Sequence, residues 1–141
     1  MERMLTEAAW GYYAFVLGTG VVVEKGKLAV FDTANGGALI PASAAAGLYP
    51  IGIFAESMTG DNIKRCQVKL HRELWLTWWD NDAGGTPAAI TDRGKACYLK
   101  DATTVTMATG GSVAGVVMDV QAAKGVLVHF PMSPIMPPAG P

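Results

Sequence analysis

The chain has 141 residues, of which half are hydrophobic and 16% are charged, and its net charge at neutral pH is −1. Disorder requires the opposite balance of low hydrophobicity and high charge, so we expect a folded protein of one domain. The balance of charges also excludes the basic surface that holds a nucleic-acid backbone, so we expect no nucleic-acid partner.

Alternating apolar and polar residues predict β-strands along most of the chain, separated by Gly-, Asn- and Asp-rich turns. In chain order the predicted strands are Tyr13–Leu17, Val21–Glu24, Lys27–Phe31, Ile51–Glu56, Cys66–His71, Leu74–Trp78, Ala96–Lys100, Thr103–Met107, Val113–Val120 and Val126–Phe130. One helical turn is predicted, over Ala42–Gly47. Short strands punctuated in this way favour a barrel or a sandwich.

The segment Ala8–Val23 contains no charged residue, so it is compared with a signal peptide and with a membrane helix. A signal peptide needs a basic region before its apolar core, whereas Arg3 is here accompanied by Glu2 and Glu7. A membrane helix needs about 20 apolar residues, and this stretch is shorter and contains glycines. We therefore expect a soluble protein, cytoplasmic when it is made, with no membrane partner.

Two parts of the chain repeat one pattern. Glu24–Phe31 and Asp92–Leu99 each begin with an acidic residue, a basic residue, Gly and Lys, and continue into an apolar strand. Ile51–Glu56 and Ala114–Asp119 form a second matching pair, each with Gly at its second position. Glycine at these positions permits a left-handed turn in the first pair and a bulge or close strand crossing in the second.

We therefore predict an all-β fold, a small barrel built from two similar strand units with an extended N-terminal arm and a Pro-rich C-terminal tail. The arm and the first strands occupy residues 1–23, and the barrel domain occupies residues 24–130. Its two units are residues 24–71 and 92–130, joined by a Trp-rich connection over residues 72–91. Residues 131–141 form the tail, whose prolines prevent a helix.

No group of residues matches a catalytic or metal-binding template. Ser112 lies in a Gly-rich segment that lacks the final glycine of a nucleophile elbow. Asp80-Asn81-Asp82 resembles the start of a calcium loop, but Thr91 stands at the twelfth position, where Glu is required. Cys66 and Cys97 lie in apolar strands and are predicted to be buried free thiols. We expect no enzyme activity, no cofactor and no metal.

Aromatic residues remain as candidates for binding. In the N-terminal segment they suit either a first barrel strand that packs on its own core or an arm that adds a strand to a partner's sheet. In the Trp-rich segment, strand alternation puts Trp78 on the predicted core face and Trp75 and Trp79 on the other face. The predicted interface residues are Trp10, Tyr12, Tyr13, Phe15, Trp75 and Trp79.

The second unit has a distinctive order of segments: Asp92–Leu99, the Thr-rich Thr103–Met107, the turn Gly110-Gly111, the strand Val113–Val117 and the closing strand Val126–Phe130. In this order they resemble the cement, or head decoration, proteins of tailed bacteriophages. The first unit is similar but looser, and the Trp-rich segment and the aromatic arm depart from the family's pattern. Membership implies a small β-barrel without catalytic activity that binds the major capsid protein of the assembled shell.

The resemblance leads us to expect a structural protein that stabilises a phage capsid. It would lie on the capsid exterior of the virion, after assembly in the host cytoplasm, and self-associate as a trimer in preference to a dimer. The six aromatic residues would contact the capsid or another protomer. Two alternatives stay open: a carbohydrate-binding module with Trp75, Trp78 and Trp79 as its stacking platform, and another structural β-barrel subunit of a phage, such as a tail part.

Overall fold

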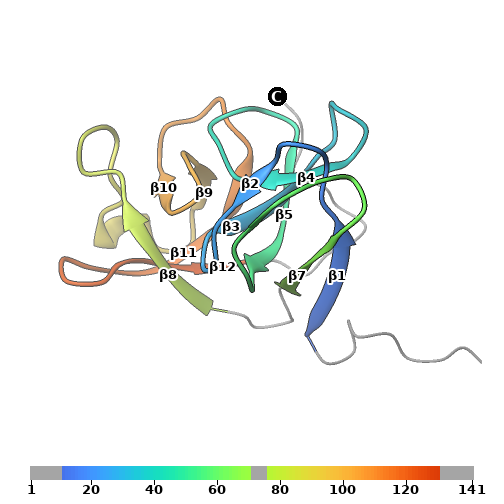
Figure 1. Ribbon diagram of the computed structural model, residues 1–141. Helices are drawn as coiled ribbons and strands as arrows, with labels where there is room; N and C mark the ends of the chain where they lie inside the picture. Colours follow the sequence, from blue (N-terminus) through green and yellow to red (C-terminus); the bar gives the residue numbers. More distant parts are fainter. Residues whose placement is uncertain (1–10, 71–75, 131–141) are drawn as a thin grey trace, which may run out of the picture.

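The computed structural model describes residues 11–70 and 76–130, and these residues form an all-β protein (Figure 1). In chain order the elements are β1 (Tyr12–Val16), β2 (Val22–Val23), β3 (Leu28–Asp32), β4 (Ala38–Pro41), β5 (Leu48–Phe54), β6 (Met58–Thr59), β7 (Arg65–Leu70), β8 (Leu76–Asn81), the 3-10 helix η2 (Ile90–Asp92), β9 (Ala96–Leu99), β10 (Thr104–Thr106), β11 (Val113–Gln121) and β12 (Gly125–His129). The predicted all-β fold with a small barrel is confirmed.

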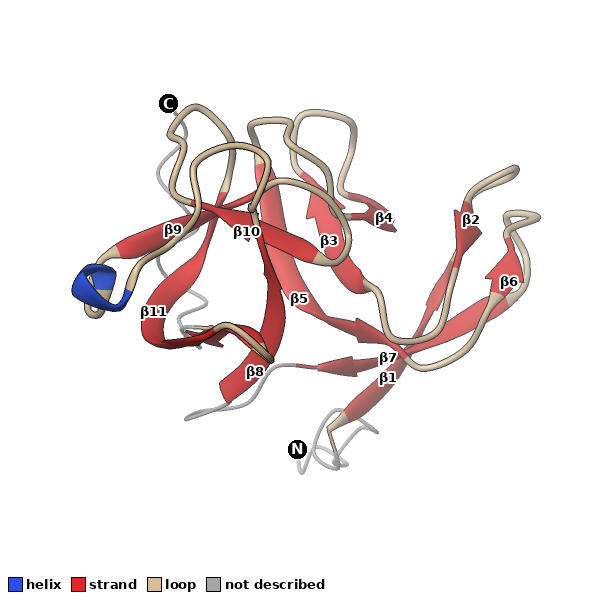
Figure 2. Cartoon of the chain, turned by 90° about the vertical axis from the view of Figure 1, so that its left-hand side faces the viewer, coloured by secondary structure: helices blue, strands red, loops and turns tan. Residues whose placement is uncertain are grey.

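The strands form two five-stranded sheets and a short ribbon (Figure 2). The first sheet is open and has the order β1-β7-β5-β3-β4, while the second closes into a barrel with the order β10-β8-β12-β11-β9. The ribbon pairs β2 with β6. The closed barrel therefore lies within the C-terminal half of the chain, and the first unit builds a sheet of its own instead of sharing one barrel with the second.

The sequence repeat recurs in the backbone hydrogen bonds. The N–H of Gly26 donates to the carbonyl of Phe54 at 2.8 Å, and the N–H of Gly94 donates to the carbonyl of Val117 at the same distance. Both glycines have a positive φ, 89° and 88°, which residues with a side chain rarely adopt. Each opening turn is thus attached to the equivalent strand of its own unit, β5 or β11.

The two sheets also share one irregularity of register. Between β3 and β5 the pairing shifts where Ala29 faces Gly52, and between β9 and β11 it shifts where Cys97 faces Gly115. A Cβ atom added at Gly52 or Gly115 would overlap a backbone carbonyl of the next strand, β7 or β12. Glycine is required at both positions because two strands approach each other there.

These matches align the sheets strand by strand. β3, β4, β5 and β7 correspond to β9, β10, β11 and β12, and β1 corresponds to β8. Phe15 pairs with Cys66 in the first sheet, and Trp79 pairs with Val126 in the barrel. In the alignment these two pairs occupy equivalent positions. β1 and β8 follow no repeat in the sequence, so only the register reveals that they are equivalent.

Two clusters of buried side chains form the core. One packs against one face of the first sheet and includes Leu17, Phe54 and Val68. The other fills the barrel and also takes in Leu28 and Val30, which lie on the face of β3 that meets the barrel. Backbone bonds join the halves as well, because the N–H of Leu28 donates to the carbonyl of Ala102 at 2.8 Å. The two halves therefore pack into one body.

The predicted helical turn over residues 42–47 is wrong. This segment is an irregular loop, and the hydroxyl of Ser112 binds it from the other half of the molecule. The hydroxyl donates to the carbonyl of Ala45 at 2.8 Å and accepts the N–H of Leu48 at 2.8 Å. These distant contacts satisfy the backbone groups that a helix would have paired locally.

Candidate functional site

β1 carries three of the six residues predicted to form an interface. The side chain of Tyr12 is 38% exposed, while Tyr13 and Phe15 are half-buried. The ring centroids of Tyr13 and Phe15 lie 4.7 Å apart, and Phe15 meets Phe31 edge-on at 5.3 Å. Residues 12–16 are therefore a strand of the chain's own sheet, paired with β7, as the first of the two interpretations expects.

β8 carries the two described tryptophans of the Trp-rich segment, and they face opposite sides of the strand. Trp79 is 6% exposed and packs edge-on against Phe130, with 6.1 Å between the ring centroids. Trp78 is half-buried, and the ammonium group of Lys124 lies 5.4 Å from its ring centroid. Two predicted interface residues lie outside the described residues: Trp10 and Trp75.

The faces of β8 are the reverse of the predicted ones. β12 pairs Val126 with Trp79 and Val128 with Thr77, and both valines are completely buried in the barrel. Trp79 and Thr77 therefore point inward. Trp79 has little surface to offer a partner, and Trp78, which we expected in the core, lies on the outer face.

The outer face of the barrel carries exposed and half-buried apolar side chains on three neighbouring strands, beside Asp119, which pairs with Leu127, and His129, which pairs with Leu76. Leu76 and Trp78 of β8 and Leu127 of β12 alternate with inward-facing residues, and Met118 of β11 lies at the bulge next to Leu127. The side chains of Leu76 and Met118 are 45% and 43% exposed. We call these four residues the outer strip. An exposed apolar strip on a closed barrel is typical of a surface that meets another protein.

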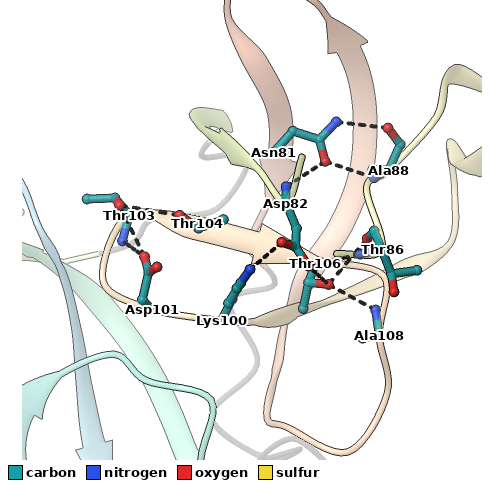
Figure 3. Close-up of polar contacts among 10 residues, drawn as sticks. All are labelled: Asn81, Asp82, Thr86, Ala88, Lys100, Asp101, Thr103, Thr104, Thr106 and Ala108. Atoms are coloured by element: carbon teal, nitrogen blue, oxygen red, sulfur yellow. Dashed lines mark hydrogen bonds and ion pairs between the residues drawn. The ribbon is translucent and has the colours of Figure 1, made fainter. Parts of the chain in front are cut away.

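A buried carboxylate ties the loop after β8 to β10 (Figure 3). Asp82 is 4% exposed. One of its oxygens accepts a hydrogen bond from the ammonium of Lys100, and the other accepts the hydroxyl of Thr106 at 2.8 Å and the N–H of Thr86 at 3.1 Å. The Lys100 ammonium, followed by Thr106 and Thr86, lowers the pKa of Asp82 to about 2. We call Asp82, Lys100, Thr106 and Thr86 the polar lock.

Asn81 extends this attachment by one residue. Its side-chain amide donates to the carbonyl of Ala88 at 2.9 Å, and its side-chain oxygen accepts the N–H of Ala88 at 2.8 Å (Figure 3). The residues that resembled a calcium loop therefore bind their own chain. Among the described residues no cluster of three potential ligands for a metal is present.

The two halves differ most at the seam between their outermost strands. In the barrel β10 pairs in parallel with β8, with Thr104 opposite Asp80, and the N–H of Asp80 donates to the carbonyl of Thr103 at 2.9 Å. In the first sheet the equivalent strands, β4 and β1, are not paired. A groove of about 360 Å³ lies between them, lined by Phe15, Val16, Gly18, Val21, Phe31, Gly37, Ala38, Leu39 and Asn62. We call this groove the open seam.

Both cysteines are free and buried, as predicted. Burial raises the pKa of the Cys66 thiol to about 11, with a smaller contribution from the charge of Glu56. Burial likewise raises the pKa of the Cys97 thiol to about 12. Both thiols therefore stay protonated at neutral pH and act as small apolar core residues.

Comparison with known proteins gives no relative. No protein-family model, no curated protein and no solved structure matches the chain. Within the described part of the chain no helix is long and apolar enough to cross a bilayer. The polar lock was not predictable from the sequence, since nothing in it pairs Asp82 with Lys100 and Thr106. β4 was also not predicted, although an alignment of the two units would have placed it opposite β10.

Proposed function

We propose that the protein is a non-enzymatic structural component that binds the assembled capsid shell of a tailed bacteriophage and stabilises it. Among the structural observations, the outer strip carries this proposal, because its apolar side chains lie on the outside of a barrel whose own strands are all paired. The resemblance of the second unit to phage cement proteins supports the choice of partner. The major capsid protein would cover the strip.

Binding of this kind needs no chemistry. A protein that binds the assembled shell and not its free subunits stabilises the shell by mass action. Because the net charge is −1, attachment rests on apolar contacts more than on charge. Self-association, as a trimer in preference to a dimer, would place several strips on neighbouring capsid subunits and raise the overall affinity through effective concentration.

The structure gives the sugar-binding alternative less support. A stacking platform needs its aromatic rings on one surface, whereas Trp78 and Trp79 face opposite sides of β8. Asn81 and Asp82, which would have supplied polar contacts, bind their own chain instead.

Co-sedimentation with empty phage capsids tests the proposal. We expect the protein to sediment with the shells, and Leu76→Asp and Met118→Asp each to weaken binding by about tenfold or more, because a charge would be buried in an apolar contact. Ile63→Asp is the matched control: Ile63 is even more exposed but lies on a loop of the first half. Absence of co-sedimentation, or equal loss for all three variants, would contradict attachment through the outer strip.

A further inference from the structure

The open seam has the hydrogen-bonding groups of an unfinished sheet. Leu17 donates its N–H to Lys64, and Gly11 accepts from Leu70, so the odd-numbered residues of β1 face β7. Antiparallel alternation then turns the backbone groups of Tyr12, Ala14 and Val16 toward the seam, where the carbonyl of Ala14 already accepts a hydrogen bond from Arg65.

On the other side of the seam, β4 offers the matching edge. Ala42 donates its N–H to the carbonyl of Leu28 at 3.0 Å, so alternation along β4 turns the backbone of Leu39 and Pro41 away from β3. Proline has no N–H and is tolerated in a strand where no ladder bond is required of it, as at an edge. The seam is therefore bordered by two edges with apolar side chains between them.

The barrel defines the direction of a strand that would fit this place. β8 and β10 run parallel to each other, and β1 and β4 are their equivalents. A strand inserted between two parallel strands can be antiparallel to both, and antiparallel pairing is the more stable kind. One extended segment that has free N–H groups and apolar side chains would suit this groove.

We propose that the N-terminal segment of a second copy of the chain, residues 1–10, lies in the open seam and joins β1 to β4. The segment contains Met4, Leu5 and Ala8, which suit a groove floored by phenylalanines and valine. It also contains Glu2 and Glu7. A cation of opposite charge, Arg65 of β7, is held next to β1, where its guanidinium donates to the carbonyl of Ala14 at 3.0 Å.

The length of the segment lets it reach a second copy of the chain. Ten extended residues reach about 33 Å, roughly twice the length of the five-residue β1, so the segment can lie along a neighbour. A two-residue hairpin back onto its own β1 would place Trp10 at the first loop position, which needs a positive φ that a bulky residue rarely adopts. A three-residue loop that ends in Gly11, whose φ is 92°, would avoid this cost, so a return onto the same chain is the competing arrangement, and it predicts a monomeric parent.

The C-terminal segment is a poorer occupant. Residues 131–141 include five prolines, none of which has an N–H to donate. Strand exchange through the N-terminal segment would give the self-association that shell binding exploits. Strand exchange uses a different surface from the outer strip. The proposal of strand exchange and the proposal of shell binding can therefore fail independently.

Light scattering on the full-length chain over a range of concentrations tests the proposal. We expect an oligomer that dissociates to a monomer in the double variant Leu5→Pro/Glu7→Pro, because proline removes two N–H donors from the inserted strand. The control Ser133→Pro/Ile135→Pro places the same two changes in the other terminal segment and should keep the parent mass.

A second pair of variants locates the contact in the seam. Ala38 lies in β4 and lines the groove, and Ala38→Asp should raise the dissociation constant by about tenfold or more. Ala122→Asp, on the exposed β11–β12 turn, should leave the constant unchanged. A monomeric parent, an oligomer that survives the N-terminal prolines, or equal effects of the two aspartates would each overturn the proposal. Shell co-sedimentation of the monomeric variants then reports on the outer strip alone.

Discussion

The two halves of this protein share a strand order, an opening turn and a bulge, yet one closes into a barrel and the other stays open. The residues at the seam also differ between the two halves. In the barrel, Asp80 and Asn81 of β8 meet Thr104 and Val105 of β10. At the equivalent place in the first sheet, β1 ends in Val16 and continues into the buried Leu17.

The polar lock belongs to the closed half alone. Thr106, which donates to Asp82, has Ile40 as its equivalent in β4. A polar attachment between distant loops thus accompanies the closed seam, and apolar side chains accompany the open one. One supersecondary pattern thus gives a closed barrel in one half and an open sheet edge in the other.

The largest expected effect tests what the halves have in common. Replacing Gly52 or Gly115 by Ala forces a Cβ atom into the backbone of β7 or β12, and we expect each change to destabilise the fold by about 4 kcal/mol or more. Gly84→Ala is the control, because a Cβ there meets no atom within 4 Å. Denaturant unfolding measures all three. Stability within about 1 kcal/mol of the parent for either core glycine would contradict the shared strand crossing.

Trp79 and Trp78 test the inward and outward faces of β8. Trp79→Ala should lower the free energy of unfolding by about 3–4 kcal/mol, since it empties a buried site next to Phe130. Trp78→Ala, on the outer face, should cost about 1 kcal/mol or less. Thermal and urea unfolding measure both. An equal loss of stability in the two variants, or a larger loss in Trp78→Ala, would contradict the observed faces and place Trp78 on the core face, as the sequence alone predicts.

The polar lock should stabilise the closed half. Thr106→Val removes a buried hydroxyl from Asp82, and we expect a loss of about 2 kcal/mol in urea unfolding. Thr109→Val, an exposed change in the following loop, should stay within about 0.5 kcal/mol of the parent. A loss for Thr106→Val no greater than that of the control would show that the lock is dispensable.

Acid should weaken the same lock. The pKa of Asp82 lies at about 2 in the folded chain against an ordinary value of 3.8, so its contribution is complete above about pH 4 and is lost as the pH falls toward 2. The free energy of unfolding should therefore fall between pH 5 and pH 2. This fall should be less steep in the variant Asp82→Asn than in the parent. An identical slope in parent and variant would contradict this role of the carboxylate.

Local patterns predicted much of the fold. The repeat of Gly26 and Gly94, and of Gly52 and Gly115, was visible in the sequence because backbone geometry allows little except glycine at those positions. Alternation placed most strands correctly. β7 is the clearest case, with Cys66 and Val68 buried and Gln67 exposed.

Features set by distant contacts were not predictable in this way. The run from Leu74 to Trp79 is almost uniformly apolar, so alternation could not determine its faces, and the valines of β12 decide them. The loop at residues 42–47 has helical composition but is bound by Ser112, 67 residues away from Ala45. Closure of the barrel likewise depends on pairing between β8 and β10, which share no local signal.

Amide hydrogen exchange at two equivalent residues tests the difference between the halves most directly. The measurement uses the full-length Leu5→Pro/Glu7→Pro variant, in which the open seam is predicted to be empty. The N–H of Asp80 donates to Thr103 across the closed seam and should exchange slowly, whereas the N–H of Val16 faces the open seam and should exchange at nearly the rate of an unfolded chain. Equal protection of Asp80 and Val16 would contradict the account.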